Sequence, residues 1–174
     1  MPSLTTNRTV IRDAQLDDAG AVTAYRSLPS VARFQRWNPT VEEFHASIER
    51  QNSRPPFTAN EWHLFVIAVP SAADPIGDVG VFPLRAGDVA LGITIAPQFQ
   101  RKGFAAEALF AVCRYLFANG VARRLIVHVD AANEASLALF RGLGFGEEML
   151  DGDEVTMCLR EARLPLGHPS TGSG

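Results

Sequence analysis

A six-residue pattern, Q-x-x-G-x-A, combines the residue types that bind a phosphate group through the backbone. Its members are Gln100, Arg101, Lys102, Gly103, Phe104 and Ala105. It stands between a predicted strand, which Pro97 ends, and a predicted helix. N–H groups in the first turn of a helix have no helical partners and lie at the positive end of its dipole. Gly103 permits a positive φ, and the small Ala105 lets an anion come close to the backbone. Arg101 and Lys102 add positive charge. The pattern is neither a P-loop nor G-x-G-x-x-G, and taken alone it fits an ordinary strand–loop–helix connection with a glycine at the bend as well as a pyrophosphate site.

A second polar group, Asn133 and Ser136, follows a predicted strand over residues 125–129. Asn133 is a natural N-cap for the helix that comes next. Ser136 is a small polar residue in the first turn of that helix, and its hydroxyl is able to satisfy nearby backbone, as helical hydroxyls often do. Both residues are candidates for chemistry, and both have a structural alternative.

The elements that must position these residues change period along the chain. Apolar spacing and capping predict an early strand over residues 9–11, a helix from Leu16 that Pro29 stops, a helical turn over 31–37 and a helix from the Thr40 capping box to about Gln51. Three β-branched runs with short connections then predict an antiparallel meander over 62–69, 76–84 and 89–96. The rest of the chain predicts a helix over 104–119, a strand over 125–129, a helix over 134–143 and two short strands around Phe145 and over 155–159.

This order of elements predicts an α/β protein: one mixed, mostly antiparallel sheet with helices on both faces. We expect a single domain over residues 1–164 and a flexible C-terminal tail over 165–174, where Pro, Gly and Ser are frequent. The net charge of −3 argues against a nucleic-acid partner, and two scattered cysteines argue against a disulfide framework or a metal site. Without a signal-peptide pattern or a membrane-spanning stretch, the sequence favours a cytoplasmic protein with no membrane partner.

Two stretches, LGITIAPQFQRKGFAAEAL and NEASLALFRGLGF, resemble the acetyl-CoA core of the GNAT acetyltransferases. The segments LTTNRTVIRDAQLDDAGAVTAYRSLPSVARFQRWNP and DPIGDVGVF extend the resemblance, more narrowly to the RimJ/RimL-type branch, over nearly the whole chain to about Leu159. The resemblance implies a GNAT-like central sheet that splays open between two strands, with acetyl-CoA as co-substrate.

The resemblance also assigns expected roles to residues. The loop from Gln100 to Ala105 binds the coenzyme A pyrophosphate, and the backbone around Ile93, Ile95 and Ala96 pairs with the pantetheine arm. Ile93 is expected to offer an N–H to the thioester carbonyl, Asn133 to contact the coenzyme arm and Ser136 to donate to the thiolate. Many GNAT enzymes carry a tyrosine acid four residues after this serine, but the residue here is Phe140. A phenyl ring cannot donate a proton, so Phe140 is expected only to contact the cofactor.

Acetyl transfer needs a base, because the attacking primary amine must be neutral. The sequence leaves seven candidates: Glu42, Glu43, His63, Asp78, Asp88, His128 and Asp130. The resemblance places acceptor recognition in residues 33–37 and the helix after them. The leading hypothesis is direct attack in a ternary complex by a peptide or protein N-terminus. A small-molecule amine (an aminoglycoside, polyamine or amino acid) and a non-catalytic coenzyme A-binding module stay open, as does a homodimer through an exposed sheet edge.

Overall fold

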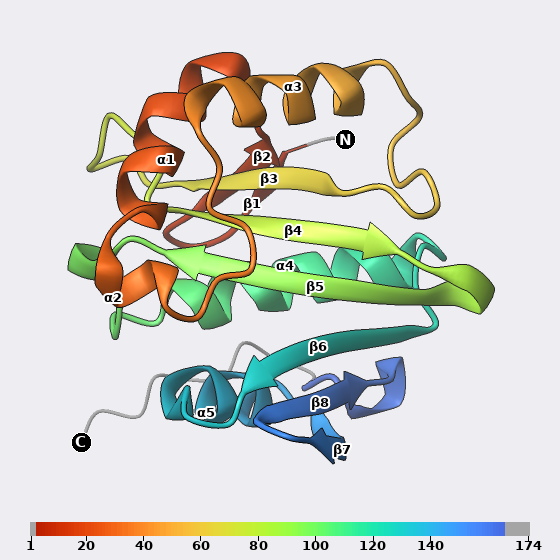
Figure 1. The fold of residues 1–174 in the computed structure, drawn as a ribbon. Helices are drawn as coiled ribbons and strands as arrows, with labels where there is room; N and C mark the ends of the chain where they lie inside the picture. Colours follow the sequence, from red (N-terminus) through yellow and green to blue (C-terminus); the bar gives the residue numbers. More distant parts are fainter. Residues whose placement is uncertain (1–2, 166–174) are drawn as a thin grey trace.

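The computed structural model describes residues 3–165, which form one eight-stranded sheet of order β1-β2-β3-β4-β5-β6-β8-β7 (Figure 1). The strands are β1 (Leu4–Thr5), β2 (Val10–Asp13), β3 (His63–Ala68), β4 (Gly77–Pro83), β5 (Asp88–Ile95), β6 (Arg124–Asp130), β7 (Gly146–Asp151) and β8 (Glu154–Leu159). All neighbours are antiparallel except β5 and β6, which run parallel.

Helices cover both faces of this sheet, as Figure 1 shows. The α-helices are α1 (Ala19–Arg26), α2 (Pro29–Ala32), α3 (Val41–Asn52), α4 (Phe104–Ala118) and α5 (Glu134–Gly142). Short 3₁₀ turns lie at η1 (Leu16–Asp18), η2 (Arg85–Gly87), η3 (Pro97–Phe99) and η4 (Glu161–Arg163). The first three α-helices lie on the face nearest the viewer, and α4 crosses behind the strands.

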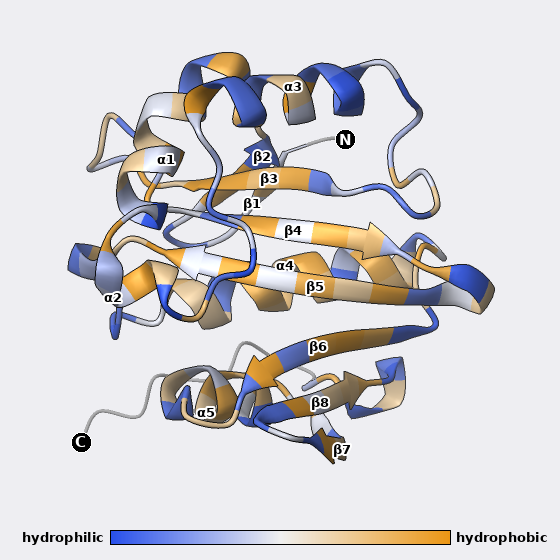
Figure 2. Cartoon of the chain, viewed as in Figure 1, coloured by the Kyte–Doolittle hydropathy of each residue, from blue (hydrophilic) through white to orange (hydrophobic). Residues whose placement is uncertain are grey.

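Two hydrophobic cores hold the layers together, one on each face of the sheet. In β3, Leu64 and Val66 pack against α1 and α3, whereas Phe65 and Ile67 join the larger core that includes α4 and α5. Burial of both faces explains why this segment reads as a continuous apolar run. Figure 2 shows the same pattern, with apolar strands inside and polar loops and outer helix faces.

The sheet opens between its two parallel strands. β5 and β6 pair only where Asp88–Ala90 lies beside Arg124–Ile126. Beyond that point β5 stays paired with β4 as far as Ile95, and β6 stays paired with β8 as far as Asp130. Residues 91–95 and 127–130 therefore diverge, which leaves a wedge between the strands with backbone groups along its sides.

The predicted fold class, meander and splayed sheet are confirmed, with differences at the N-terminal end. The two-residue strand β1 was too short to give a periodic signal, so the strand predicted over 9–11 is the second one and spans Val10–Asp13. The helical turn predicted over 31–37 is wrong in position: it spans Pro29–Ala32, because Pro29 suits the first turn of a helix. Of the predicted flexible tail, all but Pro165 lies outside the described residues.

Candidate active site

The loop before α4 has the backbone shape that an anion-binding turn needs. Gly103 has φ 80° at the N-cap of α4, in the left-handed region that glycine occupies without penalty. Arg101 also has a positive φ, 60°, which no feature of the sequence predicts. The first backbone bond of α4 runs from the Glu107 N–H to the Gly103 carbonyl. The N–H groups of Phe104 and Ala105 precede it and have no partner within the helix.

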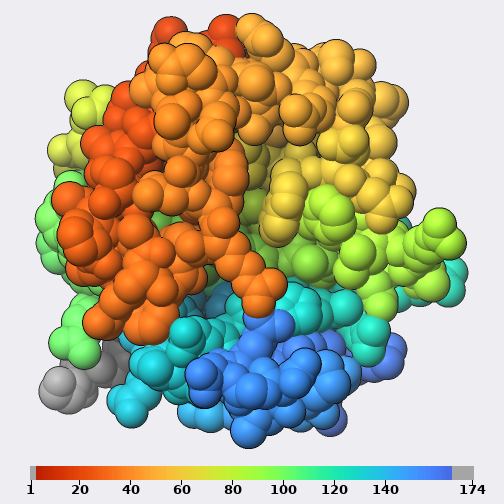
Figure 3. Space-filling model, viewed as in Figure 1, coloured from red at the N-terminus to blue at the C-terminus, as the bar shows by residue number. Residues whose placement is uncertain are grey.

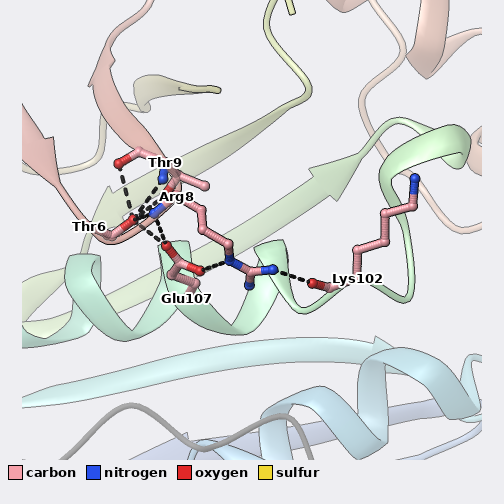
Figure 4. Close-up of polar contacts among 5 residues, drawn as sticks. All are labelled: Thr6, Arg8, Thr9, Lys102 and Glu107. Atoms are coloured by element: carbon pink, nitrogen blue, oxygen red, sulfur yellow. Dashed lines mark hydrogen bonds and ion pairs between the residues drawn. The ribbon is translucent and has the colours of Figure 1, made fainter. Parts of the chain in front are cut away.

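Hydrogen bonds and an ion pair connect this loop and the first turn of α4 to the N-terminal segment (Figure 4). The Arg8 side chain donates from Nε to Glu107 Oε2 at 2.7 Å and from Nη1 to the Lys102 carbonyl at 2.9 Å. The Arg8 backbone N–H and the Thr6 hydroxyl both meet Glu107 Oε1, at 2.7 and 2.5 Å. Burial alone would raise the pKa of Glu107, but these hydrogen bonds from Thr6 and Arg8 outweigh it and lower that pKa. These contacts of Thr6 and Arg8 with Lys102 and Glu107, which we call the brace, hold the first turn of α4 in place. The residues lie too far apart in sequence for the contacts to be predicted.

The predicted cations of the loop are available to a ligand. Arg101 and Lys102 are exposed, and within residues 3–165 neither has a carboxylate partner. The Lys102 ammonium lies 5.7 Å from the ring of Phe99. Gln100 has a different role from its neighbours, because its side-chain amide donates to the Ile95 carbonyl at 2.8 Å and ties the loop to the end of β5.

The backbone of β5 points one set of N–H groups into the wedge. Alternate residues of a regular antiparallel ladder turn their N–H and C=O groups to the same neighbour. At one end the Asp88 carbonyl accepts from the Leu84 N–H, and at the other the Ala96 N–H donates to the Ile76 carbonyl, both toward β4. The regular register between them turns the N–H of Ile93 the other way, toward β6. This donor is the one expected to meet a thioester carbonyl.

Ile95 and Ala96 are more enclosed than Ile93. The Ile95 side chain is buried in the larger core and that of Ala96 in the smaller one, whereas Ile93 is half-buried. Because the Ala96 N–H is already bonded to Ile76, it is not free for a ligand. The Ile95 N–H faces the wedge as the Ile93 N–H does, so the backbone donors that a pantetheine arm would meet on this strand are those of Ile93 and Ile95.

Two cavities meet at the wedge. The larger, of about 890 Å³, lies on the face of α1–α3, and the smaller, of about 90 Å³, extends between β5 and β6 toward α5. Asn133, Ser136 and Phe140 line only the smaller one. The residues that line both are Phe34, Gln35, Leu91, Gly92, Ile93, His128 and Asp130. A group bound in one cavity therefore reaches a group bound in the other at this shared boundary.

The smaller cavity offers one hydroxyl without a partner. Asn133 caps α5, with Oδ1 accepting from the Ser136 N–H at 3.2 Å. Thr23 and Ser47 bond the helix carbonyls four residues before them, but the Ser136 hydroxyl makes no hydrogen bond within the described chain. Phe140 is 4% exposed and packs on Phe145 at a ring distance of 5.2 Å. The smaller cavity is therefore lined by the free hydroxyl of Ser136 and by the apolar ring of Phe140.

Comparison with known proteins accounts for this arrangement. The family model for the acetyltransferase (GNAT) domain matches residues 8–146. The chain belongs to the GNAT acetyltransferase family. The uncharacterized N-acetyltransferase p20 of Bacillus licheniformis is 26% identical over 152 residues, which are 86% of this chain and 85% of that protein.

Solved structures share the fold. Mycobacterium smegmatis RimJ in complex with CoA-disulfide has a TM-score of 0.76 at 17% identity, over 92% of this chain and 86% of that one. The ribosomal L7/L12 α-N-protein acetyltransferase RimL has a TM-score of 0.73 at 16% identity, over 91% of this chain and 93% of that one.

Acetyl-CoA is the acetyl donor in GNAT enzymes, and the residues present here fit it. The turn at Gly103 with its free amides and cations suits a pyrophosphate, and the Ser136 hydroxyl suits a sulfur leaving group. Within residues 3–165, no cluster of three or more potential metal ligands occurs, and none of the helices is long and apolar enough to span a membrane.

The GNAT fold separates the base candidates by position. Glu42 and Glu43 lie at the exposed start of α3, and Asp88 pairs with Arg124 at 2.5 Å; these three line neither cavity. His63 lines only the larger cavity, where its Nε2 lies 2.8 Å from Asp13 Oδ1. His128 and Asp130 lie on the shared boundary.

Asp78, the remaining candidate, is a buried structural anion. It is 3% exposed and lines neither cavity. Its carboxylate accepts from the Tyr25 hydroxyl at 2.6 Å and from Arg26 Nε and Nη2 at 3.1 and 2.5 Å. Burial, followed by this neighbouring charge, raises the pKa of Tyr25, so that Tyr25 stays a donor.

The segment between α2 and α3, residues 33–40, forms a strap on the face of the sheet where the larger cavity lies. In Figure 3 it crosses the front surface and ends against the β7–β8 hairpin, beside the hollow of the larger cavity. Arg26 of α1 connects the strap to the body of the protein by donating a hydrogen bond to the Trp37 carbonyl at 2.7 Å. Arg36 holds it from its tip through an ion pair with Glu154 of β8. All of residues 33–37, the region expected to recognise the acceptor, line the larger cavity.

Two glycines, Gly80 and Gly92, line the larger cavity, a role that the sequence did not reveal. A Cβ on Gly80 would lie 2.9 Å from the ring of Trp62, so Gly80 lets that ring lie across the sheet. A Cβ on Gly92 would meet no atom within 4 Å, because Gly92 faces open space. Both belong to the central strands, where glycine is otherwise unfavourable.

Proposed function

We propose that this protein transfers an acetyl group from acetyl-CoA to the N-terminal amine of a peptide or protein by direct attack in a ternary complex. The observation that carries the proposal is the meeting of the two cavities at the β5–β6 wedge. The smaller cavity fits the thioester end of the donor, and the larger one fits the acceptor. Attack across their shared boundary needs no covalent enzyme intermediate.

The size of the larger cavity supports a peptide acceptor. Its volume of about 890 Å³ is at the upper end for small-molecule sites, and its walls come from α1, the strap, α3 and the β7–β8 hairpin. Five arginines line it: Arg26, Arg33, Arg36, Arg50 and Arg54. Five carboxylates line it as well, those of Glu61, Asp130, Asp151, Asp153 and Glu154, so its formal charges balance and do not distinguish a peptide from a polyamine. RimL, which shares the fold, is a ribosomal L7/L12 α-N-protein acetyltransferase.

One hydrogen-bond donor serves the carbonyl oxygen of the thioester and another serves the departing sulfur. Acetyl-CoA supplies the activated acetyl group. The Ile93 N–H stabilises negative charge on the carbonyl oxygen, an effect of about 3–4 kcal/mol for one well-placed donor. The Ser136 hydroxyl donates to the departing thiolate. Binding both reactants on one boundary lowers the barrier by up to about 7–11 kcal/mol in ideal geometry.

The decisive experiment follows coenzyme A release with three sets of acceptors: peptides that differ in their first residue, the same peptides with a blocked N-terminus, and small amines. We expect release with free N-termini, rates that depend on the first residues, and no release with blocked peptides. Release with small amines alone would replace the acceptor assignment and keep the chemistry. Tight acetyl-CoA binding without release from any acceptor would favour the non-catalytic reading.

A substitution in the lining of the larger cavity gives a matched test of the acceptor site. Gly92→Val adds bulk to open space at a strand position, so we expect a KM for the peptide at least 10-fold higher with little change in Tm. Gly142→Ala, on an α5 glycine whose added Cβ also meets nothing within 4 Å, serves as the control. An unchanged peptide KM in Gly92→Val would contradict this location of the acceptor.

A further inference from the structure

The boundary between the two cavities contains two titratable side chains among the described residues, His128 and Asp130. Both lie on the acceptor face of β6, since the alternate residues Val127 and Val129 are buried in the core of the opposite face. Asp130 is committed to the turn before α5, where Oδ1 accepts the Ala132 N–H at 2.8 Å. His128 is the group at this boundary with a pKa suited to proton transfer near neutral pH.

A carboxylate and a hydroxyl lie beside Nδ1 of the His128 ring. Nδ1 lies 3.1 Å from Glu154 Oε1 and 3.2 Å from the Thr156 hydroxyl. An ionised carboxylate only accepts hydrogen bonds, and the Thr156 hydroxyl is also able to accept one, so we assign the proton to Nδ1. In the neutral ring this leaves the lone pair on Nε2, which has no hydrogen-bond partner within residues 3–165. The side chain is 42% exposed, which is open enough for a substrate to reach it.

We propose that His128 is the general base of this acetyltransferase, with Glu154 positioning its ring and Arg36 at the tip of the strap balancing the charge of Glu154. The inference rests on the proposed function, because it assigns the proton acceptor for the same amine. It gives the strap a chemical role as well as a structural one.

The acceptor amine loses two protons in the reaction, one to His128 and one to the thiolate. The acceptor arrives as R–NH₃⁺ and transfers one proton to His128 Nε2, which forms an imidazolium and a neutral amine. The nitrogen lone pair then forms a C–N bond to the thioester carbonyl carbon, and the C–S bond breaks. The second proton leaves the new amide nitrogen and reaches the thiolate, with the Ser136 hydroxyl donating to sulfur. The imidazolium returns its proton to water.

The charges around the ring keep it neutral before substrate binds. Burial, followed by the nearby Arg36, lowers the pKa of His128. Glu154 would favour the imidazolium, but its other oxygen is paired with Arg36, so the two charges offset each other at the ring. The remaining charged groups that line the same cavity on this side are Asp130, Asp151 and Asp153; β5 contributes none. A base that starts neutral is ready to accept a proton.

The first test compares His128→Ala with His45→Ala, a histidine on α3 that bonds the Leu16 carbonyl and lines neither cavity. We expect kcat/KM for a peptide amine at pH 7 to fall about 10²–10⁴-fold in His128→Ala and to stay unchanged in the control. Acetyl-CoA affinity should be retained, and added imidazole should restore part of the rate. With an aminooxy acceptor, which is neutral at this pH, the loss should be smaller.

The second test measures the ring itself by ¹⁵N NMR, without substrate. Wild type should show Nδ1–H as the main tautomer, Glu154→Gln should mix the two, and Arg36→Gln should raise the pKa of His128. The acid limb of the pH profile of kcat/KM should move to higher pH with it. This readout survives even if no acceptor is found, which separates the two proposals. A full rate in His128→Ala, or an Nε2–H tautomer in wild type, would overturn the assignment.

Discussion

At the scale of single residues, we propose that donor binding depends on the conformation of Gly103. Its φ of 80° costs a residue with a side chain about 1–2 kcal/mol. We expect Gly103→Val to weaken coenzyme A binding at least 10-fold, measured by calorimetry. Gly120 closes the far end of α4 with φ 67° and no atom within 4 Å of an added Cβ, so Gly120→Val carries similar strain. If both variants lost affinity equally, general destabilisation would be the cause.

Asp78 is a residue whose effect on stability should exceed its effect on chemistry. Asp78→Asn leaves the buried Arg26 without its carboxylate, and breaking such a pair costs about 3–5 kcal/mol. We expect a lower Tm by calorimetry, with donor affinity retained at temperatures where the variant is folded. A stable but inactive Asp78→Asn would instead return this carboxylate to the list of catalytic groups.

At the scale of elements, the brace between the N-terminal segment and α4 controls the anion-binding turn. The groups that face the Glu107 carboxylate are donors from Thr6 and Arg8, so the amide of Glu107→Gln would turn its NH₂ toward donors. We expect a loss of about 1–3 kcal/mol in the free energy of unfolding at pH 7, together with weaker coenzyme binding.

The pH dependence of that loss has a definite sign. The folded-state pKa of Glu107 is lowered, so its contribution is complete above the unfolded pKa of about 4.3 and is lost as pH falls through the folded value. Denaturant titrations should show wild type and Glu107→Gln converging in acid. A difference that persisted unchanged to pH 2 would mean that the lost packing, and not the charge, is responsible.

At the scale of the whole molecule, both cysteines report on global unfolding. Cys113 is fully buried and Cys158 is 5% exposed. Burial raises the pKa of Cys113 to about 12 and, with the neighbouring Glu148, that of Cys158 to about 11. A disulfide reagent used to follow coenzyme A release should therefore not react with the folded protein, because the thiolate is the reactive form. Rapid labelling without denaturant would indicate a local opening of β8 or α4.

The sequence by itself determined the features that depend on neighbouring residues. Gly103 before an apolar helix predicts the positive φ, Thr40 and Glu43 predict the capping box that α3 shows, and β-branched runs with short turns predict the meander. These are local properties, set by backbone sterics, capping and periodicity. The family resemblance added the splay and the two polar residues after β6.

Only the tertiary structure decided which distant residues share the site. Glu107 meets Arg8 across 99 residues, and Asp78 meets Arg26 across 52. The strap brings Arg36 to Glu154 and so to His128, which separates one base candidate from the six others. A carboxylate or histidine has the same local pattern whether it is buried in an ion pair or open to a cavity. Its partners, and hence its chemistry, are set by how the sheet and helices pack.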